Sequence, residues 1–219
     1  TQEEIKPGDS FRYTIHVPDE GMYWYHPHLR EDIEQDMGLY GNLLVTPTDN
    51  KSYAPVNREE ALFLDDLALS NDGLPLPYNL EAADHTLMGR FGNTMLVNGS
   101  QSYALMVKKD EVVRLYLTNA ANTRTFRIQL PGAKMKLVGS DGGRYEQEMF
   151  VDAVTLSPSE RAIVDVLFEK PGRFMLEHRS PANTVTLGTV IVTTESASPS
   201  YSKVFAILRK NNDVVAGID

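Results

Sequence analysis

The 219-residue sequence contains no cysteine. This absence excludes disulfide bonds, thiolate zinc sites, a cysteine nucleophile and every metal centre that needs a thiolate ligand. The absence of cysteine does not indicate the cellular compartment in which the protein works.

Long apolar runs and basic clusters are missing as well. No stretch approaches the roughly 18 uninterrupted apolar residues that a membrane span needs. The 21 Lys and Arg residues are scattered among 30 Asp and Glu residues, which gives a net charge of −9. A negative chain repels phosphate backbones and anionic membrane surfaces. We therefore expect neither nucleic acid nor a membrane as a partner.

No long window carries a convincing helical stripe, whereas runs of β-branched and aromatic residues alternate with turn signals. These runs predict strands over residues 11–15, 112–117, 162–168 and 184–192. Hydrophobic residues make up 42% of the chain, which is enough to bury a core. The pattern predicts an all-β protein with sandwich or barrel packing.

The chain contains an internal repeat. Residues 9–28 (DSFRYTIHVPDEGMYWYHPH) align with residues 160–179 (ERAIVDVLFEKPGRFMLEHR), so that Gly21 falls on Gly172. Further along, Gly41 falls on Gly188 and begins a similar apolar run. A repeat of this length indicates two related β-domains in tandem.

The first copy of the repeat is incomplete, because only a handful of residues precede its hairpin. A copy of about three strands has too few to enclose a core. We expect residues 1–48 to be the C-terminal part of one domain and residues 49–195 to be a second domain with its connecting segment. Residues 196–219 are expected to lead toward a third domain, with residues 203–209 as its opening strand. The open sheet edge of a partial domain also favours self-association.

The best candidate ligands for a metal are His26 and His28. In a strand over residues 21–28, both side chains would point to one face, about 6.6 Å apart. Paired imidazoles on a rigid edge suit copper or zinc. A bare His-x-His pair on a strand is more often an accident than a site. Two ligands are also too few for a closed site, so further ligands would have to come from elsewhere.

The surroundings of the pair resemble the multicopper oxidase family. Residues 21–28 (GMYWYHPH) and 38–45 (GLYGNLLV) are similar to the family pattern Gly-Thr-Tyr-Trp-Tyr-His-Ser-His followed by Gly-Leu-x-Gly and an apolar strand. Met22 replaces the usual Thr and Pro27 the usual Ser, and neither change disturbs the two histidines. In the related copper nitrite reductases the matching strand reads Tyr-His-Cys. This chain has Pro27 at the position of that cysteine.

This resemblance implies cupredoxin-like Greek-key β-sandwiches, one partial and one complete. It implies that His26 and His28 match ligands of the dinuclear type 3 copper pair in a trinuclear oxygen-reducing cluster. Copper is then the cofactor, dioxygen and a small reducing substrate are the partners of the parent protein, and an extracellular or periplasmic location is expected. The second domain should hold no metal, because Glu177 and Arg179 stand at the ligand positions.

Full family members also need a first His-x-His pair and a His-Cys-His segment with type 1 copper. None of these is present here, so the fragment alone is expected to be inactive. The alternative function is a copper-free cupredoxin-like structural or binding module, similar to relatives that serve in bacterial cell division. The retained His26 and His28 argue against this alternative, because such a module needs no ligands at these positions.

The remaining candidates have plainer interpretations. We expect His178 to be a surface or packing histidine, and His16 and His85 likewise. Residues 30–36 place four carboxylates just after the histidine pair. A solvated loop is favoured there over a cation site or a proton relay, because like charges this dense favour water. Trp24 is expected to pack in the core.

Overall fold

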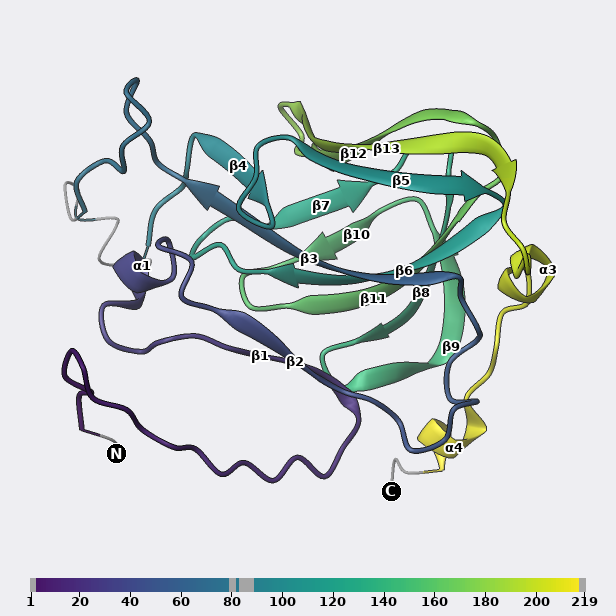
Figure 1. Ribbon diagram of the computed structural model, residues 1–219, viewed down its shortest axis with the longest axis horizontal. Helices are drawn as coiled ribbons and strands as arrows, with labels where there is room; N and C mark the ends of the chain where they lie inside the picture. The colour runs from purple at the N-terminus through teal and green to yellow at the C-terminus, as the bar shows by residue number, and fades with distance from the viewer. Residues whose placement is uncertain (1–2, 79–81, 83–88, 217–219) are drawn as a thin grey trace.

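The computed structural model describes residues 3–78, 82 and 89–216, which form a two-layer β-sandwich with a separate hairpin packed against it (Figure 1). One layer is a five-stranded sheet in the order β10-β7-β12-β13-β5, and the other is a six-stranded sheet in the order β4-β3-β6-β11-β8-β9. The prediction of an all-β protein is confirmed.

The strands of the five-stranded sheet are β10 (Val154–Leu156), β7 (Phe126–Gln129), β12 (Gly172–Arg179), β13 (Thr184–Ser196) and β5 (Tyr103–Lys109). Those of the six-stranded sheet are β4 (Thr94–Val97), β3 (Arg58–Leu67), β6 (Glu111–Asn119), β11 (Arg161–Phe168), β8 (Lys134–Ser140) and β9 (Gly143–Val151). The hairpin consists of β1 (Gly21–Tyr25) and β2 (Gly41–Val45). Single-turn helices are α1 (Glu31–Glu34), α3 (Ser202–Phe205) and α4 (Asn212–Val215). Within the described part of the chain, no helix is long and apolar enough to cross a membrane.

The core lies between the two sheets, where apolar side chains from both layers meet. β6 is buried at every residue and β11 at all but its first. Strands buried on both faces read as nearly continuous apolar runs, and this is why the sequence of these two strands does not alternate. The outer face of the six-stranded sheet is covered in part by the hairpin and in part by the segment after β13, so β6 and β11 contribute to three separate apolar clusters.

The hairpin docks through one deeply buried side chain. Met22 is 1% exposed and packs among Tyr116, Val138 and Ile163 of the sandwich. The guanidinium of Arg161 donates a hydrogen bond to the carbonyl of Met22 at 2.8 Å. Burying a methionine stabilises such a contact by roughly 2 kcal/mol. The hairpin is therefore fixed to the body of the protein, and with it the residues that follow β1.

The register of the strands confirms the internal repeat. In the hairpin, Gly21 of β1 pairs with Val45 of β2 in antiparallel fashion. In the sandwich, Gly172 of β12 pairs with Val192 of β13 in the same way. These are the positions that the sequence alignment makes equivalent, so the first copy builds the same hairpin as the second.

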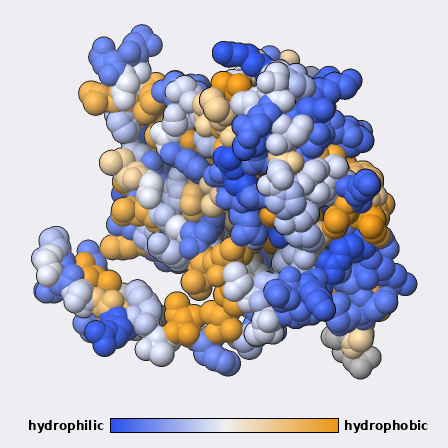
Figure 2. Space-filling model, turned by 45° about the vertical axis from the view of Figure 1, so that its right-hand side comes forward, coloured by the Kyte–Doolittle hydropathy of each residue, from blue (hydrophilic) through white to orange (hydrophobic). Residues whose placement is uncertain are grey.

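The strand predicted over residues 11–15 is wrong, because these residues do not belong to a sheet. Their counterpart β11 is flanked by β6 and β8, and the first copy has no equivalents of these two strands within the described residues. Phe11, Tyr13 and Ile15 are 54%, 60% and 68% exposed. The segment runs apart from the sandwich along the bottom of Figure 1, and Figure 2 shows hydrophobic surface along it. Self-association through an open sheet edge of the partial domain stays a prediction.

The strand predicted over residues 203–209 is also wrong. The short helix α3 occupies its beginning, and Phe205 is 3% exposed between Val112 and Leu167 of the sandwich. The buried ammonium of Lys136 donates to the carboxylate of Glu148 at 2.9 Å and to the carbonyl of Ile207 at 3.2 Å. These side-chain bonds hold the segment against β8 and β9, so it follows the sandwich rather than starting a sheet. The division into residues 1–48, 49–195 and 196–219 stays a prediction.

Candidate metal centre

The two candidate histidines follow β1 directly. The strand ends at Tyr25, which pairs with Gly41, the first residue of β2. A side chain at position 41 would collide with the ring of Tyr25, so glycine allows this close approach. The prediction that the strand continues through His28 is wrong, because β2 offers no residue before Gly41 for pairing. His26 and His28 therefore lie at the start of the loop that connects β1 to β2.

The two imidazole rings nevertheless lie side by side. Their centroids are 4.7 Å apart and their planes are inclined by 33°. The indole of Trp24 stacks on His26 with a centroid distance of 4.3 Å and an angle of 26°. Trp24 is only half-buried, so its predicted place in the core is wrong, and it packs against the candidate ligand instead. This stacking limits the orientations open to the His26 ring.

The hydrogen-bond partner of His26 indicates which nitrogen can bind a metal. Its Nδ1 lies 3.1 Å from the carbonyl oxygen of Pro27. A carbonyl only accepts hydrogen bonds, so the neutral ring carries its proton on Nδ1 and donates it there. The lone pair of Nε2 is then available for coordination.

The acidic segment after the histidines folds differently from its prediction. A solvated loop was expected over residues 30–36, whereas residues 31–34 form α1 and none of the four carboxylates is fully exposed. Arg30 donates two hydrogen bonds to Asp32, at 3.0 and 2.8 Å. Glu31 places a carboxylate oxygen 3.5 Å from Nδ1 of His28. Helix α1 thus brings an acidic group to the histidine pair.

Asp36, the last of these carboxylates, points into the protein. It is 8% exposed and accepts a hydrogen bond from the amide of Asn122 at 2.7 Å. Burial raises the pKa of Asp36 to about 6. Burial removes water that would stabilise the charged carboxylate, and this raises its pKa. The hydrogen bond from the Asn122 amide stabilises the charged form and opposes the shift.

A second buried carboxylate lies on the sandwich side of the same region. The hydroxyl of Tyr40 donates to Asp65 at 2.9 Å, and burial raises the pKa of Asp65 to about 8. Tyr40 lies 6.4 Å from Trp24 between ring centroids, so aromatic rings connect His26 to this carboxylate. Sequence reasoning missed Asp65. Its only signal was a charged pair, Asp65-Asp66, that directly follows the apolar run 61–64 within strand β3.

The other histidines take the structural roles expected of them where they are described. His178 is 4% exposed, accepts a hydrogen bond from the backbone N–H of Arg127 at 3.0 Å, and packs edge-on against Phe126. It is a packing histidine, and burial lowers its pKa. His16 is exposed, and His85 lies outside the described residues.

Among the described residues, the one group of three or more side chains with metal-binding spacing consists of His26, His28 and Glu31. Their candidate ligand atoms all lie within 4.8 Å of one another. An open pocket of about 580 Å³ adjoins the two histidines. The absence of metal from the second domain stays a prediction.

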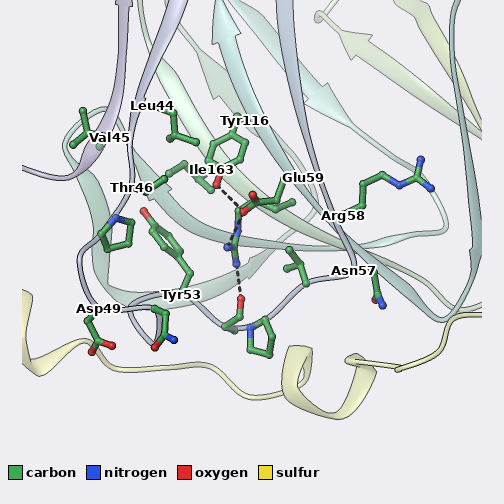
Figure 3. Close-up of a pocket in the computed structure, with 17 residues that line it drawn as sticks. Leu44, Val45, Thr46, Asp49, Tyr53, Asn57, Arg58, Glu59, Tyr116 and Ile163 are labelled. Atoms are coloured by element: carbon green, nitrogen blue, oxygen red, sulfur yellow. Dashed lines mark hydrogen bonds and ion pairs between the residues drawn. The ribbon is translucent and has the colours of Figure 1, made fainter.

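A separate cavity of about 580 Å³ lies between β2 and the six-stranded sheet, and Figure 3 shows its lining. The hydroxyl of Tyr116 donates to Glu59 there at 3.0 Å, and Arg114 donates to the carbonyl of Ala54 at 2.9 Å (Figure 3). None of the described residues that line this cavity is a histidine. Without imidazole donors, it offers no ligand set for copper that rivals the histidine pair.

Comparison with known proteins identifies the class to which this architecture belongs. The two-layer sandwich matches that of cupredoxin-like copper proteins, among them a multi-copper oxidase from Pseudomonas thermotolerans with a TM-score of 0.75 at 28% identity. Family models described as multicopper oxidase match residues 1–50 and residues 67–203. The chain therefore belongs to the multicopper oxidase family, whose cofactor is copper.

The relatives are much longer than this chain. It is 34% identical over 165 residues to the cell division protein FtsP of Pectobacterium atrosepticum, covering 72% of this chain and 34% of that protein. It is 30% identical over 166 residues to the multicopper oxidase MmcO of Mycobacterium tuberculosis. This match covers 63% of this chain and 32% of that protein. The match to the Pseudomonas structure covers 88% of this chain and 46% of the chain in that structure. The chain thus spans about a third of the curated relatives and under half of that structure.

Proposed function

We propose that this chain is part of an oxidase in which His26 and His28 hold copper at a trinuclear, oxygen-reducing cluster. The observation that carries the proposal is the pair of rings 4.7 Å apart at the end of a docked hairpin. The family match over residues 1–50, which contain both histidines, supports it. The parent protein would oxidise a small reducing substrate and reduce dioxygen to water.

The donor set of the site fits copper. Neutral imidazole nitrogens are good ligands for this metal, and the contact from Nδ1 of His26 to Pro27 leaves Nε2 of that ring available. Bound copper would supply one-electron redox chemistry, so that four substrate oxidations match the four electrons that dioxygen needs. The protein's part is to orient the ligands: Trp24 stacks on His26, and Met22 anchors the hairpin that carries both rings. An extracellular or periplasmic location is part of the proposal.

A copper-free module remains the second candidate function, favoured by one observation. The cell division protein FtsP of Pectobacterium atrosepticum matches this chain at 34% identity, above the 30% of the multicopper oxidase MmcO. Against this candidate stands the pair of adjacent imidazoles, which a purely structural module does not require. The two functions differ in whether the histidines matter for activity.

We expect the His26→Ala/His28→Ala double variant of the longer protein to lose oxygen uptake with a phenolic reductant down to background, because the cluster would lack two ligands. The matched control is His16→Ala, which removes an exposed histidine outside the candidate site. Oxygen-electrode rates on copper-loaded protein provide the measurement. Equal rates above background in the wild type and the double variant would contradict the proposal by placing the oxygen-reducing site elsewhere. Background rates in the wild type would favour the copper-free module.

A further inference from the structure

The cavity between β2 and the six-stranded sheet has a wall that hydrogen bonds hold in place. The guanidinium of Arg114 donates to the carbonyl of Ala54 at 2.9 Å, and the backbone N–H of Val112 donates to the side-chain oxygen of Asn57 at 3.0 Å. The N–H of Asn57 donates in turn to the carbonyl of Val112 at 2.9 Å. These bonds tie the segment between β2 and β3 to β6. The cavity of about 580 Å³ is therefore preformed, and its size is ordinary for a small-molecule site.

The apolar side chains beside the cavity are unevenly covered. Met22 and Leu44 are cross-strand partners in the hairpin, so their side chains share one face of it. Met22 is 1% exposed, whereas Leu44 is 40% exposed because it stands over the cavity (Figure 3). Ile163 and the ring of Tyr116 line the same space. A ligand with an apolar body would cover Leu44 and remove apolar surface from water.

The charged groups around the cavity favour a cationic ligand. Arg114 is neutralised by Asp165 through two hydrogen bonds of 2.8 and 2.9 Å, and Arg58 lies 3.0 Å from the carboxylate of Glu111. Glu59 lies farther from Arg114, at 3.6 Å, and its side chain is 53% exposed. Both cations of the lining thus have closer partners, and the carboxylate of Glu59 is open to a ligand.

Tyr116 orients this carboxylate. Its hydroxyl donates to Oε1 of Glu59 at 3.0 Å (Figure 3). Burial raises the pKa of Tyr116, and the negative charge of Glu59 raises it further, so the phenol keeps its proton and remains the donor. Because this bond uses Oε1, Oε2 can accept a hydrogen bond from an ammonium group. Asp49 adds a second carboxylate to the lining.

We propose that this cavity binds a small organic ammonium ion with an apolar body, whose charge pairs with Glu59 and whose body lies against Leu44 and Ile163. This role goes beyond the proposed copper chemistry and does not depend on it. Metal ions are poor candidates, because apolar walls offer them no ligands and the described lining has no imidazole. An anion would meet the like charge of Glu59.

The test is an NMR titration of the metal-free 219-residue chain with tryptamine as the probe. We expect the methyl signals of Leu44 and Ile163 to shift saturably, while those of Leu176, in the core between the two sheets, stay in place. Tryptophol, in which a hydroxyl replaces the ammonium group, should bind about 3- to 5-fold more weakly, because a half-exposed ion pair contributes modestly. Indole-3-propionate, the anionic analogue, should bind more weakly still.

Glu59→Gln should lower the affinity for tryptamine to that for tryptophol, since glutamine keeps an acceptor for Tyr116 but loses the charge. Glu60→Gln is the matched control and should keep the preference, because neighbouring residues of a strand point to opposite faces and Glu60 does not line the cavity. Circular dichroism checks that both variants fold.

Three outcomes would overturn the proposal. The first is the absence of saturable shifts at Leu44 and Ile163. The second is equal affinity of the wild type for tryptamine and tryptophol, and the third is a preference for tryptamine that survives Glu59→Gln. None of these outcomes touches the copper-binding role of His26 and His28, because the titration contains no metal.

Discussion

Replacing Asp165 with alanine is expected to lower the free energy of unfolding by about 3–5 kcal/mol. Asp165 and Arg114 join adjacent strands β11 and β6 through two hydrogen bonds of 2.8 and 2.9 Å, and their side chains are only 1% and 5% exposed. Burial raises the pKa of Asp165, while the guanidinium opposes that shift and the bidentate geometry favours the ionised pair. Alanine would leave a buried positive charge without its main partner. Urea denaturation followed by circular dichroism measures the loss.

Two controls separate the buried charge from other effects. The surface pair of Lys134 and Glu169 has a similar distance of 2.9 Å but side chains 57% and 46% exposed, so Glu169→Ala should cost less than about 1 kcal/mol. The double variant Arg114→Met/Asp165→Leu removes both charges and should be more stable than Asp165→Ala. A loss below about 1 kcal/mol for Asp165→Ala would show that Arg114 finds another partner, such as Glu59, which lies 3.6 Å away.

The 219-residue chain loaded with copper is expected to show no blue absorption band and no oxygen uptake. Type 1 copper owes its blue colour to a cysteine thiolate ligand, and this chain has no cysteine. Among the described residues, the histidine pair with Glu31 is the one cluster of metal-binding spacing, which is too small for three copper ions. Neither the entry of electrons nor the four-electron reduction of dioxygen can then proceed.

Visible absorption spectroscopy and an oxygen electrode with a phenolic reductant test this expectation. A copper-loaded relative that contains the complete set of ligands serves as the positive control under the same conditions. A blue, oxygen-consuming sample of this chain would contradict the account of its site.

The sequence predicted the features that local patterns encode. Alternating and continuous apolar runs located β6, β11 and β13, and the repeat placed Gly21 and Gly172 at equivalent points of two hairpins, which the strand register confirms. The adjacency of His26 and His28 was also predicted, although from a strand that ends before them. The rings lie 4.7 Å apart in the loop after β1, closer than the roughly 6.6 Å that a strand would give.

The features that the sequence did not predict depend on distant partners. Residues 11–15 alternate as a strand should, but an apolar pattern forms a sheet only when neighbouring strands are available. Helix α1 is too short to show a helical period, so the position of Glu31 beside His28 could not be foreseen. The burial of Asp36 and Asp65 follows from contacts with Asn122 and Tyr40, which lie far from them along the chain.

The central claim, that His26 and His28 bind copper, is tested most directly by diffraction from crystals of this chain soaked with Cu²⁺. Data collected on both sides of the copper absorption edge locate the metal without assumptions about its ligands. The account predicts an anomalous peak within about 2.2 Å of a ring nitrogen of each histidine, which is roughly a metal–imidazole bond length. A peak elsewhere in the molecule, with both imidazoles free of metal, would contradict it.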